Sequence, residues 1–220
     1  SCNYFFYEMG YLLQMDRLNK YATQLGLGQK TGVELSGEKA GNLAGPESRE
    51  ANGGEKWYAA DTLMAAIGQS DHLFTPIQLA NYVATLVNGG TRYQPHLLKT
   101  VMDYTNTQVY EEVQPTVLNT VEISASSLAA IKEGMKGVVT EDGTASSYFA
   151  GFPIQVGGKT GSAQMVNHSA TGVFVSFAPY DQPEIAVCVV GEYASSGGSL
   201  APVAIAAYDQ YFGLGLNEAE

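Results

Sequence analysis

The sequence predicts an α+β fold in which an antiparallel sheet is flanked by helices. Apolar residues recur at helical spacing near both ends of the chain and in two stretches between them. Residues 154–192, in contrast, contain three strand-like runs joined by short links. Consecutive strands with short links favour an antiparallel meander, and helices before and after it would cover the sheet in layers.

The first expected element is a helix within residues 1–25. Its apolar residues follow nearly helical spacing until Gly26 and Gly28, which are typical of a helix end. Residues 26–58 are rich in Gly, Glu, Ser and Asn and show no sustained period. We therefore expect a long irregular segment after the first helix.

A second helix is expected after Thr75. Residues 61–69 return to an ordered pattern, and a short loop leads to Thr75, a suitable N-cap, and Pro76, which suits a first helical position. The run Asn88-Gly89-Gly90 ends this helix. The side chains expected on its buried face are Leu79, Ala80, Val83, Leu86 and Val87.

The middle of the chain predicts a hairpin and a third helix. Residues 97–104 and 108–113 flank the turn Thr105-Asn106-Thr107. Ser124 or Ser126 then caps a helix that ends near Thr140. Its expected apolar stripe is Leu128, Ile131, Met135, Val138 and Val139.

The sheet and a last helix occupy the C-terminal part of the chain. Strands are expected at residues 154–165, 172–178 and 185–192, with a proline-containing turn before the third. A glycine and serine turn at 195–199 precedes a helix that starts at Pro202. Its expected core residues are Val203, Ile205, Ala206, Tyr208 and Phe212.

Composition limits the classes of function. The 220 residues are 45% hydrophobic and 15% charged, which is enough for one or two globular cores. No run of about 18 apolar residues occurs, so we expect no membrane-spanning helix in this chain. The net charge is −11, with 11 basic residues against 22 acidic ones, and this balance excludes nucleic acid as a partner.

The sequence offers neither a disulfide framework nor a metal site. Cys2 and Cys188 are far apart, and Cys188 lies in an apolar run typical of a buried strand. His72, His96 and His168 are scattered without the spacing of metal ligands. We predict no metal and no cofactor.

The stretch 156–164, Val-Gly-Gly-Lys-Thr-Gly-Ser-Ala-Gln, is the strongest candidate for a functional site. Glycine is a poor strand residue because it packs nothing and loses much entropy on folding. Glycines beside Lys159, Thr160 and Ser162 suit a strand that a ligand approaches closely while a cation and hydroxyls meet its carboxylate or carbonyl. The alternative interpretation is a tight glycine turn with a solvated lysine.

Two short motifs carry a resemblance to a known family. Ser1-Cys2-Asn3 at the head of a helix and Lys159-Thr160-Gly161 on a strand resemble two of the three motifs of the penicillin-binding protein and serine β-lactamase superfamily. Further segments, in order along the chain, are similar to a class B penicillin-binding protein transpeptidase domain. These are Ala66-Ile67-Gly68-Gln69, residues 75–80, Asn88-Gly89-Gly90, Pro95-His96, Val138-Val139-Thr140, Gly143-Thr144-Ala145, Gly161-Ser162-Ala163-Gln164 and Phe177-Ala178-Pro179.

The resemblance implies acyl transfer in cell-wall synthesis. A serine would attack the D-Ala-D-Ala end of a peptidoglycan stem peptide, D-alanine would leave, and an amino group of a neighbouring stem peptide would take the acyl group. β-Lactam antibiotics would acylate the same serine. The intact protein would be anchored in the cell membrane and act on its outer side, with the anchor outside this chain.

The resemblance also implies roles for individual residues. The expected catalytic residues are Ser1, which would relay a proton to the leaving amine, Asn3, which would hold the substrate amide, Lys159, and Ser162, whose N–H would serve an oxyanion hole. Lys159 and Thr160 would meet the donor carboxylate. The expected substrate-binding residues are Thr160, Gly161 and Gln164. Residues 167–172 depart from the family pattern, which leaves the acceptor side less defined.

The third family motif, Ser-x-x-Lys, would carry the nucleophile. One literal match occurs, Ser36-Gly37-Glu38-Lys39, but it lies in the glycine-rich segment and follows Ser1-Cys2-Asn3, whereas the motif requires a helix that precedes it. We therefore expect no nucleophile in this chain. Residues 1–220 would be the C-terminal part of a single transpeptidase domain, inactive alone and completed by the N-terminal part of the same protein as a second fragment.

Three other functions are compatible with this resemblance. A non-catalytic penicillin-recognising domain would bind peptidoglycan or sense antibiotics, and penicillin labelling of the complete protein separates it from the enzyme. A D,D-carboxypeptidase would give the acyl group to water. A β-lactamase is less favoured because no deacylating glutamate loop can be placed.

Overall fold

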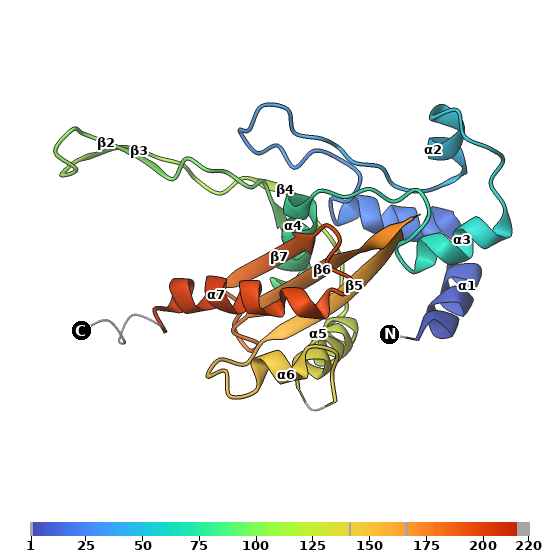
Figure 1. Cartoon of the computed structure of the whole chain (residues 1–220). Helices are drawn as coiled ribbons and strands as arrows, with labels where there is room; N and C mark the ends of the chain where they lie inside the picture. The colour runs from blue at the N-terminus through green and yellow to red at the C-terminus, as the bar shows by residue number, and fades with distance from the viewer. Residues whose placement is uncertain (1, 141, 166, 215–220) are drawn as a thin grey trace.

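The computed structural model describes residues 2–140, 142–165 and 167–214, and an antiparallel three-stranded sheet lies at its centre. Strands β5 (Gly157–Met165), β6 (His168–Ala178) and β7 (Ile185–Gly191) follow one another in space as they do in sequence. Helices lie on both faces of this sheet (Figure 1). The predicted α+β class and the meander are thus confirmed, with β6 starting four residues earlier than expected.

Strand β6 supplies side chains to a separate core on each face of the sheet. Phe174 and Ala178 point to helix α7 (Ala201–Phe212). Val175 and Phe177 pack instead with residues of α4 (Pro76–Val87) and α5 (Ala125–Val139). This alternation follows from the two-residue period of a strand, and it explains why β6 carries so many buried apolar residues.

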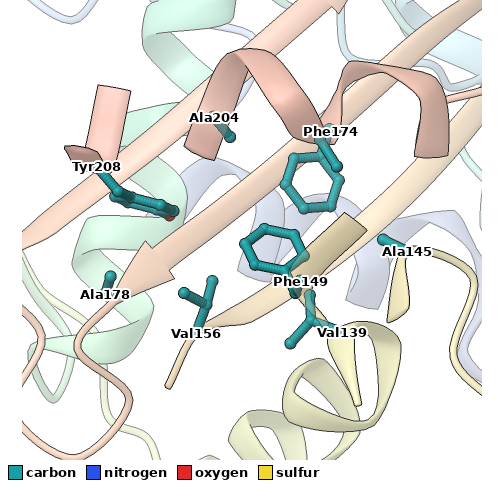
Figure 2. Close-up of a cluster of buried hydrophobic side chains, with 9 residues drawn as sticks. Val139, Ala145, Phe149, Val156, Phe174, Ala178, Ala204 and Tyr208 are labelled. Atoms are coloured by element: carbon teal, nitrogen blue, oxygen red, sulfur yellow. The ribbon is translucent and has the colours of Figure 1, made fainter. Parts of the chain in front are cut away.

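The core beneath α7 is built from aromatic rings. Figure 2 shows Phe149, Phe174 and Tyr208 with smaller side chains around them, and the rings of Phe149 and Phe174 have centroids 6.0 Å apart. The Tyr208 hydroxyl donates a hydrogen bond of 2.6 Å to the buried Ser176 hydroxyl. Each fully buried ring of this size stabilises the fold by roughly 1.5–3 kcal/mol.

Helix α7 starts as predicted, but the predicted core face is partly wrong. Tyr208 of the predicted face is buried, as expected, together with Ala201 and Ala204, whereas Val203 is 56% exposed. Ala206 is exposed as well. Tyr208 is completely buried and pairs with Ser176, so tertiary contact sets the rotation of the helix rather than the hydrophobicity of Val203.

Helix α4 agrees with the prediction at both ends. The Thr75 hydroxyl accepts from the N–H of Gln78 at 3.4 Å, Pro76 occupies the first turn and Asn88 is the C-cap. Gln78 was not expected in the core, yet it is 1% exposed. Its side-chain amide donates to the carbonyls of Gln29 at 2.6 Å and Ala40 at 2.8 Å, and so holds the irregular segment against α4.

Ser124, one of the two predicted caps, caps helix α5: its hydroxyl accepts from the N–H of Ser127 at 3.1 Å. The last residue of the helix is Val139 and its C-cap is Thr140, which agrees with the predicted end near Thr140. Met135 and Val139 of the predicted stripe are buried, but Ile131 is 39% exposed. The short helix α6 (Ser146–Phe149) follows; four residues are too few for a periodic signal in the sequence.

The N-terminal part is helical and then largely irregular, as predicted. Helix α1 (Asn3–Gln24) is kinked at Gln14, and α3 (Ala59–Ala66) packs across it. The irregular segment also contains a short helix, α2 (Pro46–Ala51), that the sequence did not predict. None of the helices in residues 2–140, 142–165 and 167–214 has the length and apolar character that a membrane span requires.

The predicted hairpin is present and projects away from the body of the molecule (Figure 1). Its strands β2 (Thr100–Met102) and β3 (Val109–Glu112) are shorter than expected. A second pair, β1 (Thr91–Tyr93) with β4 (Val117–Thr120), lies at its base. These two strands were not predicted because three or four residues show no clear alternation.

Candidate active site between α1 and β5

A pocket of about 430 Å³ lies between the start of α1 and strand β5. Its lining combines three separate parts of the chain. These are Asn3, Phe6 and Tyr7 of α1, Met64, Ala66, Ile67 and Gln69 of α3 and the loop after it, and Lys159, Thr160, Gly161, Ser162 and Gln164 of β5. Six of the seven residues predicted for the site therefore line one pocket; the seventh, Ser1, lies outside the described residues.

Residues 157–163 of β5 pair with β6 in continuous register, with an irregularity between Ala163 and Met165, so the glycines lie in a strand and not in a tight turn. Lys159 lies opposite Val175 and Gly161 opposite Val173. Among the described strands, β6 is the one partner of β5, so the other edge of β5 carries no strand. Such an edge presents backbone N–H and C=O groups to an extended peptide.

Two of the glycines serve the core rather than a ligand, which corrects part of the expectation. A Cβ atom on Gly157 would lie 2.4 Å from the ring of Phe177. One on Gly158 would lie 2.9 Å from the ring of Phe174. Both glycines are buried and admit these rings, so their close approach is to the sheet's own aromatic side chains.

Lys159 brings a positively charged side chain to the lining of the pocket. It is the one charged residue among the described residues that line the pocket. Its ammonium group donates a hydrogen bond to the carbonyl of Thr160. Although the side chain reaches solvent, neighbouring atoms partly desolvate the ammonium, and this desolvation lowers the pKa of Lys159. A cation here favours an anionic ligand in a chain whose net charge is −11.

Hydroxyl groups lie beside this cation. The hydroxyls of Thr160 and Thr144 are 2.8 Å apart and hydrogen bonded. Thr144 precedes α6, so it reaches β5 from another part of the chain. The sequence did not identify Thr144 as a site residue, although it lies in Gly143-Thr144-Ala145, a segment that carried the family resemblance.

The loop before α7 packs against β5 beside the pocket. The N–H of Gly197 donates to the hydroxyl of Ser162 at 3.4 Å. A Cβ atom on Gly197 would lie 2.2 Å from the carbonyl oxygen of Val173 and 2.4 Å from that of Gly161. Only glycine fits this contact. The sequence analysis identified Gly197 only as part of a glycine and serine turn.

Gln69 contacts β5 from the opposite wall of the pocket. Its side-chain amide donates to the carbonyl of Ser162 at 3.5 Å, the long end of the hydrogen-bond range. Ser162 is thus held at its hydroxyl by Gly197 and at its carbonyl by Gln69. The sequence identified Gln69 only as part of a family-like segment.

The literal Ser-x-x-Lys match does not form a catalytic pair. Ser36 and Gly37 form a turn, residues 38–39 have no regular secondary structure, and Gly37 has a left-handed φ of 81°. The Glu38 carboxylate accepts from the N–H of Thr31 at 2.7 Å and from its hydroxyl at 2.6 Å. Ser36 and Lys39 therefore share no helical face. The described residues also contain no group of three or more His, Cys, Asp or Glu that could hold a metal ion.

Comparison with known proteins identifies relatives along the whole chain. Residues 1–209 match the penicillin binding protein transpeptidase domain. The chain is 30% identical to the peptidoglycan D,D-transpeptidase MrdA of Escherichia coli, covering 90% of this chain and 33% of that protein. It is 36% identical to penicillin-binding protein 2A of Bacillus subtilis, covering 80% of this chain and 25% of that protein.

A solved structure gives the same answer for the fold. The crystal structure of Pseudomonas aeruginosa PBP2 in complex with WCK 5153 superposes with a TM-score of 0.82 at 33% identity. The match covers 95% of this chain and 46% of that one. The chain thus spans between a quarter and a half of the length of these relatives. It belongs to the penicillin-binding protein transpeptidase domain family.

Proposed function

We propose that the intact protein is a serine-type D,D-transpeptidase that cross-links peptidoglycan stem peptides. The observation that carries this proposal is the single pocket lined by Asn3 at one end of the chain and by Lys159, Thr160 and Ser162 near the other. These residues belong to two motifs of the family. The relatives of this chain include peptidoglycan D,D-transpeptidases, which supports the same reaction class for the intact protein.

The donor peptide would bind through its terminal carboxylate. Lys159 provides the positive charge, and Thr160 provides a hydroxyl that Thr144 orients at 2.8 Å. A charge-assisted hydrogen bond of this kind contributes about 1.5–3 kcal/mol. The peptide backbone would lie along the edge of β5 that carries no strand in the described part of the chain, as an added strand beside Gly161 and Gln164.

The chemical steps assign a role to each remaining residue. A serine hydroxyl attacks the penultimate D-alanine carbonyl, and the N–H of Ser162 stabilises the resulting oxyanion. The C–N bond to the terminal D-alanine breaks, and Ser1 relays a proton to the departing amine. Asn3 binds an amide group of the substrate peptide. An acceptor amine then attacks the acyl ester, forms the cross-link and returns the proton to serine.

The nucleophile of this reaction would come from a Ser-x-x-Lys segment in the N-terminal part of the same domain. Residues 1–220 would then be the C-terminal part of one domain, inactive without that partner. The site would lie on the outer side of the cell membrane, where the peptidoglycan substrate is. β-Lactams, whose carboxylate resembles that of the donor peptide, would occupy the same pocket.

The test uses the full-length protein, a stem peptide ending in D-Ala-D-Ala and a labelled amine acceptor. Release of D-alanine together with a labelled cross-linked product supports the proposal, and Lys159→Ala is expected to abolish both. Release of D-alanine without cross-linked product would identify a D,D-carboxypeptidase. Absence of both products, together with no covalent fluorescent penicillin adduct, would identify a non-catalytic sensor module.

A further inference from the structure

Arg49 joins three segments near the wall of the pocket. Its Nη1 atom lies 2.9 Å from Asp61, its Nε donates to Asp71 at 2.6 Å, and its Nη2 donates to the Ser70 hydroxyl at 3.1 Å. The guanidinium group also stacks over Trp57 at 4.4 Å from the ring centroid. Every nitrogen of the guanidinium is engaged, and the side chain is only 16% exposed.

These partners lie at both ends of α3. The Asp61 carboxylate accepts from the N–H of Tyr58 at 2.7 Å and so caps the start of this helix. Ser70 and Asp71 follow its last residues. Arg49 therefore fixes α3 and the loop after it as one unit, and the planar fork of arginine is needed to reach all three oxygen partners at once.

The loop that Arg49 fixes carries a residue into the pocket. Gln69 is adjacent to Ser70, and its amide reaches the carbonyl of Ser162 on β5. Ser70 has a left-handed φ of 64°, which is an unfavourable backbone conformation for a residue with a side chain. The hydrogen bond from Arg49 to the Ser70 hydroxyl helps to hold this unfavourable backbone conformation next to Gln69.

We propose that Arg49 is a positioning residue for the site: it holds the loop 68–71 so that Gln69 fixes Ser162 on the wall of the pocket. Arg49 itself does not line the pocket. It acts through Gln69 on the residue whose N–H is the proposed oxyanion donor. This inference rests on the proposed function, because it treats the pocket between α1 and β5 as the acylation site.

The test compares acylation of the full-length protein by a fluorescent penicillin in Arg49→Lys, Gln69→Ala and the double variant. Arg49→Lys keeps the positive charge but loses the planar, forked guanidinium group that contacts Asp61, Ser70 and Asp71 together. Each single change is expected to lower the acylation rate constant roughly threefold to tenfold, the effect of one lost hydrogen bond. If Arg49 acts through Gln69, the double variant is no slower than Gln69→Ala alone.

Arg92→Lys is the matched control. Arg92 is a buried arginine whose Nε donates to Asn119 at 2.6 Å, and neither residue lines the pocket. This change is expected to lower the melting temperature without altering the acylation rate of the folded protein. The inference is overturned if Arg49→Lys behaves like Arg92→Lys, or if the losses in the double variant multiply.

Hydrogen exchange provides a second readout that needs no activity. Arg49→Lys and Gln69→Ala are both expected to speed exchange of the amides of residues 157–165, whereas Arg92→Lys leaves them unchanged. If the wild-type protein forms no penicillin adduct but this exchange pattern appears, the proposed function fails and the positioning by Arg49 stands. Unchanged exchange in Arg49→Lys overturns the positioning itself.

Discussion

Gly197→Ala tests whether the loop before α7 supports β5 at the pocket. The backbone of Gly197 has φ −67° and ψ −25°, which alanine adopts without strain, so any effect of the added methyl group is steric. That methyl group would lie 2.2 Å from the carbonyl oxygen of Val173 and 2.7 Å from the nitrogen of Gly161. Both are backbone atoms of paired strands and have little freedom to move.

The structure sets the size of the effect. An ordinary contact begins at 3.4 Å, so the gap to Val173 must widen from 2.2 Å by about 1.2 Å. Overpacking of this kind costs roughly 1–3 kcal/mol. Because Gly161 follows Lys159 and Thr160 on β5, part of the shift moves the donor site. A misplacement of about 1 Å in a catalytic site can slow reaction by roughly 100-fold.

The assay measures urea unfolding and penicillin acylation of the full-length Gly197→Ala protein. The free energy of unfolding is expected to fall by about 2 kcal/mol, and acylation of the folded protein is expected to slow by at least about tenfold. Gly134→Ala in α5 is the control: apart from its chain neighbours and the nearby backbone of its own helix, no atom lies within 4 Å of the new methyl group. It is expected to stabilise the protein by about 0.5–1 kcal/mol without changing acylation. A Gly197→Ala protein with unchanged stability and acylation would refute the reasoning.

Three further predictions concern buried or partly buried polar groups. Gln78→Leu leaves two partly buried carbonyl groups without their donors and is expected to destabilise the protein by roughly 2–5 kcal/mol in urea unfolding. Gln78→Glu, when protonated at low pH, can donate to one of them and is expected to lose less stability than Gln78→Leu. Burial lowers the pKa of His72, whose Nδ1 accepts from the N–H of Ala44 at 3.1 Å. As the pH falls below 6.5, His72 binds a proton in the unfolded state but resists protonation in the folded state. The free energy of unfolding is therefore expected to decrease as the pH falls, and this decrease is expected to be smaller in His72→Gln. Because desolvation lowers the pKa of Lys159 below 10.5, penicillin affinity is expected to fall roughly 10- to 100-fold as the pH rises through that lowered value. In Lys159→Arg, penicillin affinity is expected to stay constant over this pH range. If the affinity of Lys159→Arg falls at alkaline pH as it does in the wild-type protein, the carboxylate does not contact Lys159.

Local signals in the sequence predicted the elements that depend on neighbouring residues. Thr75 and Ser124 cap their helices through N–H groups three residues ahead, so the short-range pattern was sufficient. The orientation of α7 was predicted less well. Val203 is more hydrophobic than Ala204, but only the rotation that buries Tyr208 lets its hydroxyl reach Ser176. That contact joins residues far apart in sequence and leaves no periodic signal.

In the candidate site, too, the sequence identified residues that belong to local motifs but not residues that act through long-range contacts. The family motifs directed attention to Asn3 and Lys159, and the structure brings both to one pocket. Gly197 and Thr144 contact β5 through a single close approach and a single hydroxyl pair. A glycine in a turn or a threonine before a helix is common in any sequence, so neither contact could be predicted without the fold.

The most direct test of the account is a crystal structure of the full-length protein after reaction with penicillin. We expect a covalent adduct in the pocket between α1 and β5. The ligand carboxylate would lie within hydrogen-bond distance of Lys159 and Thr160, and its acyl carbonyl oxygen would accept from the N–H of Ser162. An adduct whose carboxylate lies away from Lys159, or a protein that remains unmodified, would contradict the assignment of this pocket as the donor site of a transpeptidase.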